Sequence, residues 1–139
     1  MILIFGGAYQ NKLEYAKARF NFTDADVFDC DIFMQEQLEM KIIPEEVRDL
    51  DLSKRVIDHF EVFVRCFAES GADLNAYLDE HREDLKDKII ISRDETQGLV
   101  PVNASDRAYR ELLGRTLTKL ATESDQVVRV FLGLGQDIK

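Results

Sequence analysis

The segment from Gly6 to Leu13, GGAYQNKL, carries residue types that bind phosphate in many nucleotide-binding proteins. In a complete phosphate-binding loop, GxxxxGK followed by Ser or Thr, backbone N–H groups surround the phosphates, the lysine reaches the outer phosphates, and the hydroxyl holds Mg²⁺. Gly6 and Lys12 match two of the four signature positions. The segment follows an apolar run and precedes a helical pattern, so we predict that it forms a nucleotide-binding loop. The loop would consist of Gly6, Gly7, Ala8, Tyr9, Gln10, Asn11, Lys12 and Leu13. Lys12 is also predicted as a catalytic residue.

Two positions depart from this pattern. Asn11 replaces the second glycine, which is tolerable because Asn adopts left-handed backbone conformations more readily than other non-glycine residues. Leu13 replaces the Ser or Thr and offers no oxygen to a metal, so Mg²⁺ would need water or a carboxylate from elsewhere. In the alternative interpretation, the glycines only allow a tight turn and Lys12 is a solvated surface charge. The motif by itself leaves both interpretations open.

Asp29 is the second candidate, because it ends a short apolar run, Val27 and Phe28. An acid at the tip of a neighbouring strand can bind the Mg²⁺ of a nucleotide, so we predict Asp29 as a metal ligand and catalytic residue. Its position alone favours a cap in an acidic loop over a metal ligand. The surrounding segment 24–51 holds ten acidic residues but lacks the spacing of a calcium loop, so a solvated acidic face is the better interpretation.

The histidines and cysteines give no further candidate. His59 and His81 lie outside any arrangement of Ser, Cys and carboxylate residues that suggests nucleophilic catalysis, and we interpret both as ordinary helix residues. Cys30 and Cys66 lie 36 positions apart without a CxxC motif, so neither a zinc site nor a disulfide framework is expected. The first residues, MILIFGGA, lack the layout of a secretory signal, and we expect reduced thiols in a cytoplasmic protein.

Net charge and hydropathy exclude two classes of function. Eighteen Lys and Arg against 27 Asp and Glu give a net charge of −9, which repels the phosphate backbone of nucleic acids, so no nucleic-acid partner is expected. No stretch approaches the roughly 20 apolar residues of a membrane span. The 139 residues suffice for one domain with a core, so we predict a single domain over 1–139.

The apolar periods of the chain alternate between strand-like and helix-like. Strands are predicted at Ile2 to Phe5, Val27 to Cys30, Ile89 to Ile91 and Val127 to Leu132. Helices are predicted around Leu13 to Phe20 and from Leu74 to Lys88. Another helix is predicted from a Ser53 cap to Gly71, with an apolar stripe from Val56 to Phe67. The last predicted helix begins at an Asn103 cap and has an apolar stripe from Tyr109 to Leu120. Asp106, at the N3 position of the last helix, would complete a weak capping box. Gly133 and Gly135 are interpreted as the start of an exit from the last strand.

This order predicts an α/β fold of the P-loop type, with a mainly parallel sheet and helices on both faces. In such folds, ligands bind at the carboxyl ends of the strands. Three segments are therefore expected to meet at one edge of the sheet: the loop from Gly6 to Lys12, residues 29–31, and the loop from Arg93 to Pro101, which includes Asp94 and Gly98.

Four strings, GGAYQNKLEYA, GLVPVN, LGRTLTKLA and RVFLGLGQDIK, together resemble the adenosylcobinamide kinase / adenosylcobinamide-phosphate guanylyltransferase family of cobalamin biosynthesis. The resemblance covers about the first 20 and the last 50 residues, and the middle of the chain is not convincingly covered. It implies a P-loop enzyme that uses Mg²⁺ with ATP or GTP and transfers phosphate to the aminopropanol hydroxyl of adenosylcobinamide. It also implies a second step in which GMP is carried on a histidine, a corrinoid partner, and assembly as a homo-oligomer, since family members form trimers.

Position by position, the resemblance assigns the family's phosphate loop to Gly6, Gly7, Ala8 and Lys12, while Asn11 and Leu13 break it. Asp29-Cys30 resembles the Asp-Cys that ends the family's metal-binding strand. Further matches, in the family's Asn-Glu-Val-Gly loop and beyond it, are Asp94, Gly98, Val100, Pro101, Asn103 and Arg115. The family's guanylylated histidine has no counterpart, because no histidine occurs before position 59 and the His81-Arg82 pair lies too far along. Guanylyl transfer by the covalent route is therefore not expected.

Three hypotheses remain. The first is a shortened enzyme related to cobinamide kinase, in which Lys12 and the loop amides stabilise the γ-phosphate. The second is a non-catalytic relative that binds a nucleotide or a corrinoid or takes part in assembly, which Leu13 and the missing histidine favour. The third is an unrelated α/β binding module with a chance glycine turn.

Overall fold

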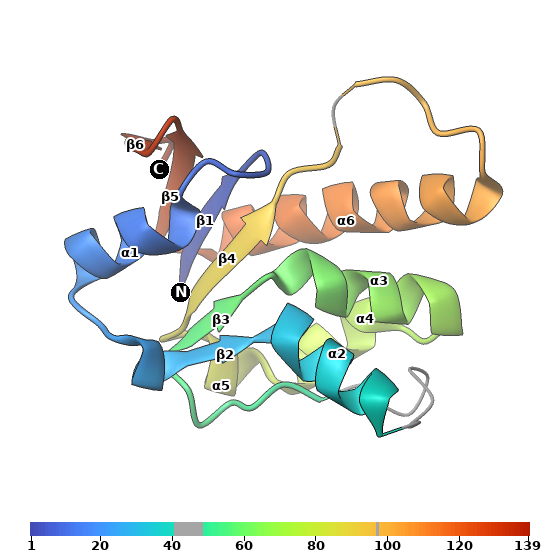
Figure 1. Ribbon diagram of the computed structural model, residues 1–139, viewed down its shortest axis with the longest axis horizontal. Helices are drawn as coiled ribbons and strands as arrows, with labels where there is room; N and C mark the ends of the chain where they lie inside the picture. Colours follow the sequence, from blue (N-terminus) through green and yellow to red (C-terminus); the bar gives the residue numbers. More distant parts are fainter. Residues whose placement is uncertain (41–48, 97) are drawn as a thin grey trace.

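The computed structural model describes residues 1–40, 49–96 and 98–139, which form an α/β fold around one sheet (Figure 1). The sheet in these residues has the strand order β2-β3-β4-β1-β5-β6, in which the first five strands are parallel and β6 is antiparallel to β5. The strands are β1 (Ile2–Gly6), β2 (Val27–Asp29), β3 (Val56–Asp58), β4 (Ile89–Arg93), β5 (Gln126–Phe131) and β6 (Leu134–Asp137). The predicted fold class, a mainly parallel sheet with helices around it, is confirmed.

Helices cover both faces of the sheet. They are α1 (Lys12–Phe20), α2 (Cys30–Glu39), α3 (Phe60–Ser70), α4 (Leu74–Glu80), α5 (Arg82–Leu85) and α6 (Ala104–Glu123), with a 3₁₀ turn at Asp24–Asp26. On one face, Ala16 of α1 packs against strand residues such as Ile4 and Val128. On the other face, α3, α4 and α6 pack against Leu3, Ile57 and their neighbours. No helix among these described residues is long and apolar enough to cross a membrane.

The helix predicted after the Asn103 cap is confirmed as α6. The Asn103 side chain accepts a hydrogen bond from the Ser105 amide at 2.7 Å and so caps the helix. The buried stripe lies as expected, at Tyr109, Leu113, Leu117 and Leu120. Asp106 does not complete a capping box: its carboxylate accepts a hydrogen bond from Arg65 of α3 at 3.3 Å.

The prediction for residues 53–70 is wrong in its first part. Val56 and Ile57 are fully buried in strand β3, and the helix begins only at Phe60. Val56 lies four positions before Phe60, so its side chain fits a helical stripe by spacing alone. Pairing with β2 on one side and β4 on the other decides for the strand, because it gives these buried backbone groups partners. The segment 74–88 likewise contains two helices, divided at His81.

The carboxyl end of the chain forms a hairpin, which the prediction of an exit after Gly133 missed. Leu132 and Gly133 both have positive φ, 53° and 76°, and turn the chain back into β6. The hairpin is fixed to α1, because the Arg19 guanidinium makes two hydrogen bonds to the Asp137 carboxylate, at 2.6 and 2.9 Å. Residues 41–48, which belong to the acidic segment 24–51, lie outside the described residues.

The parallel register brings the predicted loops to one edge of the sheet. Gly6 at the end of β1 pairs with Arg93 at the end of β4, and Asp29 at the end of β2 pairs with Asp58 at the end of β3. The loops after β1, β2 and β4 therefore start at the same edge, as expected, and the end of β3 joins them.

Gly6 can be tested as a requirement of this packing. A Cβ atom at Gly6 would lie 2.4 Å from the backbone oxygen of Val130, whereas one at Gly7 would meet only Gln10 Cγ at 3.9 Å. We expect Gly6→Ala to lower the free energy of unfolding by about 1–3 kcal/mol, as overpacking does. Gly7→Ala should change it by less than about 0.5 kcal/mol. Urea denaturation of both variants checks this, and equal stabilities would contradict it.

Candidate functional site

The loop between β1 and α1 has the shape that its residues predict. Tyr9 and Asn11 both have left-handed backbone conformations, with φ of 58° and 60°, so the conformation expected for Asn11 is confirmed. Lys12 is the first residue of α1, and its Nζ donates a hydrogen bond to the Gly7 carbonyl at 2.7 Å. The ammonium group thus lies over the loop and not in open solvent. Burial lowers the pKa of Lys12, although the carboxylates of Glu61 and Asp58 act in the opposite direction.

Neighbouring strands hold this loop on both sides. The Leu132 amide donates to the Gln10 side-chain oxygen at 2.6 Å, and the Gly133 amide donates to the Gln10 carbonyl at 3.0 Å. On the other side, the Asp94 amide donates to the Gly6 carbonyl at 2.9 Å. The tip residue Tyr9 remains 96% exposed. The loop is therefore fixed at its base by two strands while its tip stays open to a ligand.

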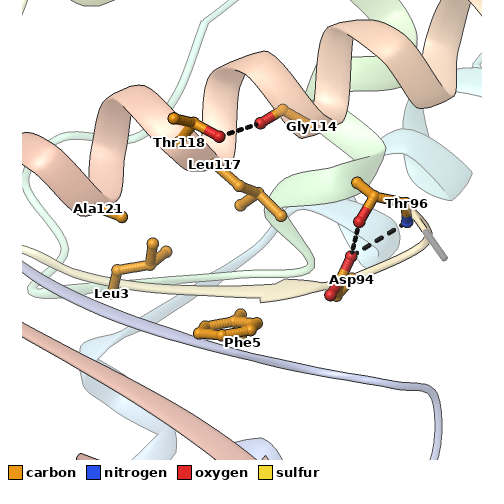
Figure 2. Close-up of a pocket in the computed structure, with 8 residues that line it drawn as sticks. All are labelled: Leu3, Phe5, Asp94, Thr96, Gly114, Leu117, Thr118 and Ala121. Carbon is orange, nitrogen blue, oxygen red and sulfur yellow. Dashed lines mark hydrogen bonds between the residues drawn. The ribbon is translucent and has the colours of Figure 1, made fainter. Parts of the chain in front are cut away.

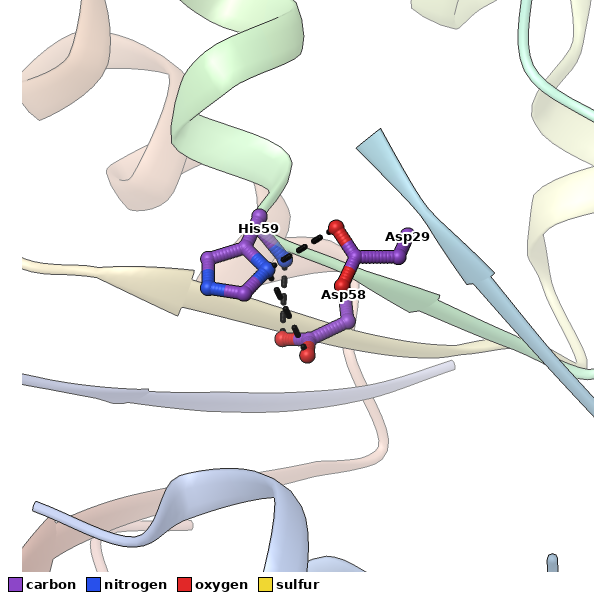
Figure 3. A group of neighbouring side chains, drawn as sticks. All are labelled: Asp29, Asp58 and His59. Carbon is purple, nitrogen blue, oxygen red and sulfur yellow. Dashed lines mark hydrogen bonds and ion pairs between the residues drawn. The ribbon is translucent and has the colours of Figure 1, made fainter. Parts of the chain in front are cut away.

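Asp29, Asp58 and His59 form a compact group at the ends of β2 and β3 (Figure 3). His59 Nδ1 lies 3.0 Å from Asp29 Oδ1 and 3.6 Å from Asp58 Oδ2. The hydrogen bond to Asp29, opposed by burial and supported by the charge of Asp58, raises the pKa of His59 to about 9. The interpretation of His59 as an ordinary helix residue is therefore wrong: it precedes α3 in a left-handed conformation, with φ of 52°, and bridges two carboxylates.

The two carboxylates of this group differ in environment. Asp58 is only 4% exposed, and burial raises its pKa. Asp29 caps α2, since one of its oxygens accepts hydrogen bonds from the amides of Asp31 and Ile32 at 2.9 and 3.2 Å. Burial raises the pKa of Asp29, but the hydrogen bonds from His59 and these amides outweigh it, so the net pKa is lowered. The capping role that the sequence allowed for Asp29 is thus present in the structure, and its role as a metal ligand stays a prediction.

A charged cavity of about 110 Å³ lies beside this group, between α3, the end of β4 and α6. Glu61 accepts a hydrogen bond from the Arg93 amide at 2.9 Å, and the Arg93 guanidinium lies 3.8 Å from Glu61 and 3.6 Å from Glu95. The Tyr109 hydroxyl donates to Glu95 at 2.6 Å. Glu61 and Glu95 therefore both have polar partners. The wall of the cavity combines these carboxylates with the cationic side chains of His59, Arg65 and Arg93.

The loop after β4 divides into two parts. Asp94 lies at the sheet edge, where its carboxylate accepts a hydrogen bond from the Thr96 amide at 3.0 Å. Gly98 and Pro101 do not join it at the strand ends, because their carbonyls accept hydrogen bonds from Arg110 and Arg107 of α6 at 3.1 and 3.0 Å. The loop arches away from the sheet toward the start of α6 (Figure 1). Of these three predicted residues, only Asp94 lies close to the loop between β1 and α1.

A family model described as cobinamide kinase / cobinamide phosphate guanyltransferase matches residues 51–138. The chain belongs to this family. The matched region begins just before β3, so it includes the middle of the chain, which the four resembling strings do not cover convincingly. It does not include Gly6 to Leu13, so the phosphate-binding role of this loop stays a prediction.

A second comparison finds that the chain is similar to alpha-actinin of Dermatophagoides farinae. The two sequences are 31% identical over 91 residues, which is 65% of this chain and 9% of that protein. Because the chain spans so little of that protein, the similarity carries no conclusion about activity.

Sequence reasoning missed two of the residues that this member of the cobinamide kinase family brings together, Asp58 and His59. The signal was present as Val56-Ile57-Asp58-His59, an apolar pair followed by an acid, which is the same pattern that singled out Asp29 after Val27 and Phe28. Because residues 53–70 were predicted as one helix, the end of strand β3 at Asp58 was not recognised. Arg115, which matches the family pattern, lies apart on the exposed side of α6 and pairs with Glu111 at 2.6 Å.

The raised pKa of His59 predicts a pH dependence of stability. The pKa is about 9 in the folded chain against 6.5 in the unfolded chain, so the folded state binds the proton more tightly. The stabilisation is therefore fully present below pH 6.5 and is lost as the pH rises through about 9. We expect the urea midpoint, measured with EDTA, to fall between pH 6.5 and 10 in the wild type, and this fall to be smaller in His59→Gln. An identical fall in both proteins would contradict the ion pair.

Proposed function

We propose that this chain is a nucleotide-dependent transferase of cobalamin biosynthesis that resembles adenosylcobinamide kinase and moves a phosphoryl group from ATP or GTP to adenosylcobinamide. One observation carries the proposal: Lys12 of the glycine-rich loop lies within electrostatic reach of Asp58 and Glu61, which come from the matched part of the chain. Cation, carboxylates and loop amides thus converge on one edge of the sheet. The membership of the family supplies the corrinoid acceptor and, through the known trimers of its members, a proposed homotrimer.

In this proposal, the loop binds the phosphates and Lys12 stabilises the charge of the γ-phosphate. The amides of the loop and of the first turn of α1 are available for an anion, and the helix dipole favours negative charge there. Lys12 would exchange its hydrogen bond with the Gly7 carbonyl for one with a phosphate oxygen. Phosphoryl transfer needs mainly positioning and electrostatic stabilisation, so these groups account for most of the chemistry.

The proposal includes Mg²⁺ bound with the nucleotide. Mg²⁺ prefers oxygen ligands and usually takes one or two carboxylates from the protein, and Asp58 and Asp29 offer such oxygens within 4.8 Å of each other. The burial that raises the pKa of Asp58 also makes a nearby cation favourable there. Leu13 contributes no oxygen, so Asp58 would be the principal protein ligand and Asp29 the second. When bound, Mg²⁺ supplies positive charge to the β- and γ-phosphates.

A non-catalytic relative is the second candidate, and one observation favours it. Both carboxylates that would hold the metal are already compensated by the His59 imidazolium, and Leu13 provides no replacement. Such a protein would bind a nucleotide or a corrinoid without turnover. The guanylyl transfer step is not expected in either case, because no histidine occurs before position 59. Detection of phosphorylated adenosylcobinamide after incubation with ATP or GTP separates the two candidates.

Nucleotide binding tests the first step. We expect ATP or GTP with Mg²⁺ to bind saturably in a calorimetric titration, and Lys12→Ala to weaken binding at least about tenfold, since a charge-assisted hydrogen bond is lost. Lys17→Ala, one turn further along α1, is the matched control, because Lys17 pairs with Glu14 and Asp24 on the surface. An equal loss of nucleotide affinity in both variants, or no binding by the wild type at millimolar nucleotide, would contradict the proposal.

The metal ligand is tested separately. Asp58→Asn keeps the size of the side chain and removes its charge, so we expect the dependence of nucleotide affinity on Mg²⁺ to disappear, with about a tenfold loss at saturating Mg²⁺. Asp29→Asn should have a smaller effect, because Asp29 also serves as a helix cap. Removal of Mg²⁺ from the wild type should reproduce the Asp58→Asn affinity. An Asp58→Asn protein that still responds to Mg²⁺ would exclude this residue as the ligand.

A further inference from the structure

A second cavity lies on the other face of β1, away from α1. Its volume is about 400 Å³, and it lies between β1, the end of β4 and α6 (Figure 2). Leu3 and Phe5 of β1 form one wall, and Leu117 and Ala121 of α6 form the opposite wall. This volume is in the range of about 300–1,000 Å³ that small-molecule sites occupy.

Small residues on α6 keep this cavity open. Gly114, Leu117, Thr118 and Ala121 are spaced so that they share one helix face, and two of them have little or no side chain. A Cβ atom at Gly114 would lie 3.3 Å from Thr96 Cγ2, so even alanine would press against the loop that closes one end. The cavity therefore exists because α6 has small side chains on the face toward β1.

One end of the apolar cavity carries a carboxylate. Asp94 lies beside Phe5 and Thr96 there, half-buried, and among the described residues only Thr96 donates hydrogen bonds to it (Figure 2). Within the same described part of the chain, no Lys, Arg or His nitrogen lies within 4.0 Å of Asp94, whereas its neighbour Glu95 lies 3.6 Å from Arg93. An uncompensated carboxylate at the end of an apolar cavity attracts a cation more strongly than one in water does.

We propose that this cavity binds an organic ammonium ion, with its apolar body between β1 and α6 and its ammonium group on the Asp94 carboxylate. The apolar walls select the body, and the charge of Asp94 selects a cation over a neutral or anionic group of the same shape. Binding in this cavity needs neither Lys12 nor a nucleotide, so this proposal does not depend on the proposed transferase activity.

The probe is 4-phenylbutylamine, compared with 4-phenylbutan-1-ol and 4-phenylbutyrate, which share its body and differ in charge. We expect the amine to bind saturably, with amide shifts in ¹⁵N-resolved NMR spectra at Leu3, Phe5 and Gly114. The alcohol should bind about tenfold more weakly and the acid more weakly still, because the ion pair is absent or reversed. Equal affinities of the three probes, absence of saturation, or shifts confined to other parts of the chain would overturn the proposal.

Variants separate the site from general attraction to an acidic protein. Asp94→Asn should reduce the affinity for the amine to that for the alcohol, whereas Asp106→Asn, which removes the same charge from the exposed start of α6, should not. Ala121→Leu fills the cavity and should weaken all three probes at least tenfold, with Thr122→Leu as the exposed control on the same helix. If Ala121→Leu lowers the melting temperature, Gly114→Ala provides a smaller filling. Unchanged binding in Asp94→Asn, or in both filling variants, contradicts the proposal.

Discussion

Parallel pairing of β2 with β3 forces two carboxylates together, because Asp29 and Asp58 are register partners at the strand ends. Their repulsion, in a place where Asp58 is almost fully buried, needs a cation, and His59 supplies it from the next position in the chain. The left-handed backbone of His59 lets the ring turn back between the two acids before α3 begins. Left-handed backbone in a non-glycine residue costs free energy and persists where the surroundings compensate it. The backbone turn at the start of α3 and the charge balance at the ends of β2 and β3 thus meet in one ion-paired group.

The loop from Gly6 to Leu13 depends on its neighbours in a comparable way. Gly6 is required by the backbone oxygen of Val130, and Gln10 is held by the hairpin that follows β5. The loop shape is therefore set by strand packing, whatever its ligand is. This explains why the left-handed Asn11 is tolerated where the family pattern has glycine: the turn is stabilised from outside by hydrogen bonds that do not involve the Asn11 side chain. Leu13 is different, because its side chain has no oxygen to offer a metal. Under the proposed function, Mg²⁺ would depend on Asp29 and Asp58, which lie at strand ends distant in sequence.

How much the sequence could predict follows from the range of the interactions. The cap and stripe of α6, and the strands β1 and β4, are encoded by local patterns and were predicted correctly. Val56 and Ile57 could not be assigned by period, since Val56 continues the stripe of Phe60 and Phe63 by coincidence, and only pairing with two other strands settles the matter. In the candidate site, too, residues of a local motif could be predicted and residues that meet through distant contacts could not. Gly6 and Lys12 belong to one local motif, whereas Asp58 and His59 meet Asp29 through a contact across 30 positions. The hairpin was missed because Leu132 at positive φ has no signature in its residue type.

A net charge of −9 opposes the binding of an extended polyanion far more than that of a single triphosphate. Charges on the surface act over about 8 Å at physiological ionic strength, so the local balance decides. At the sheet edge, Asp29 and Asp58 are compensated by His59, and Glu61 and Glu95 by Arg93, which leaves the ammonium of Lys12 with a carbonyl as its hydrogen-bond partner. On the far face of β1 the balance is reversed, because Asp94 has only amide and hydroxyl donors from Thr96 in the part of the chain that the structure describes. One strand thus separates a region suited to an anion from a region suited to a cation, and each is defined by which charges the fold pairs.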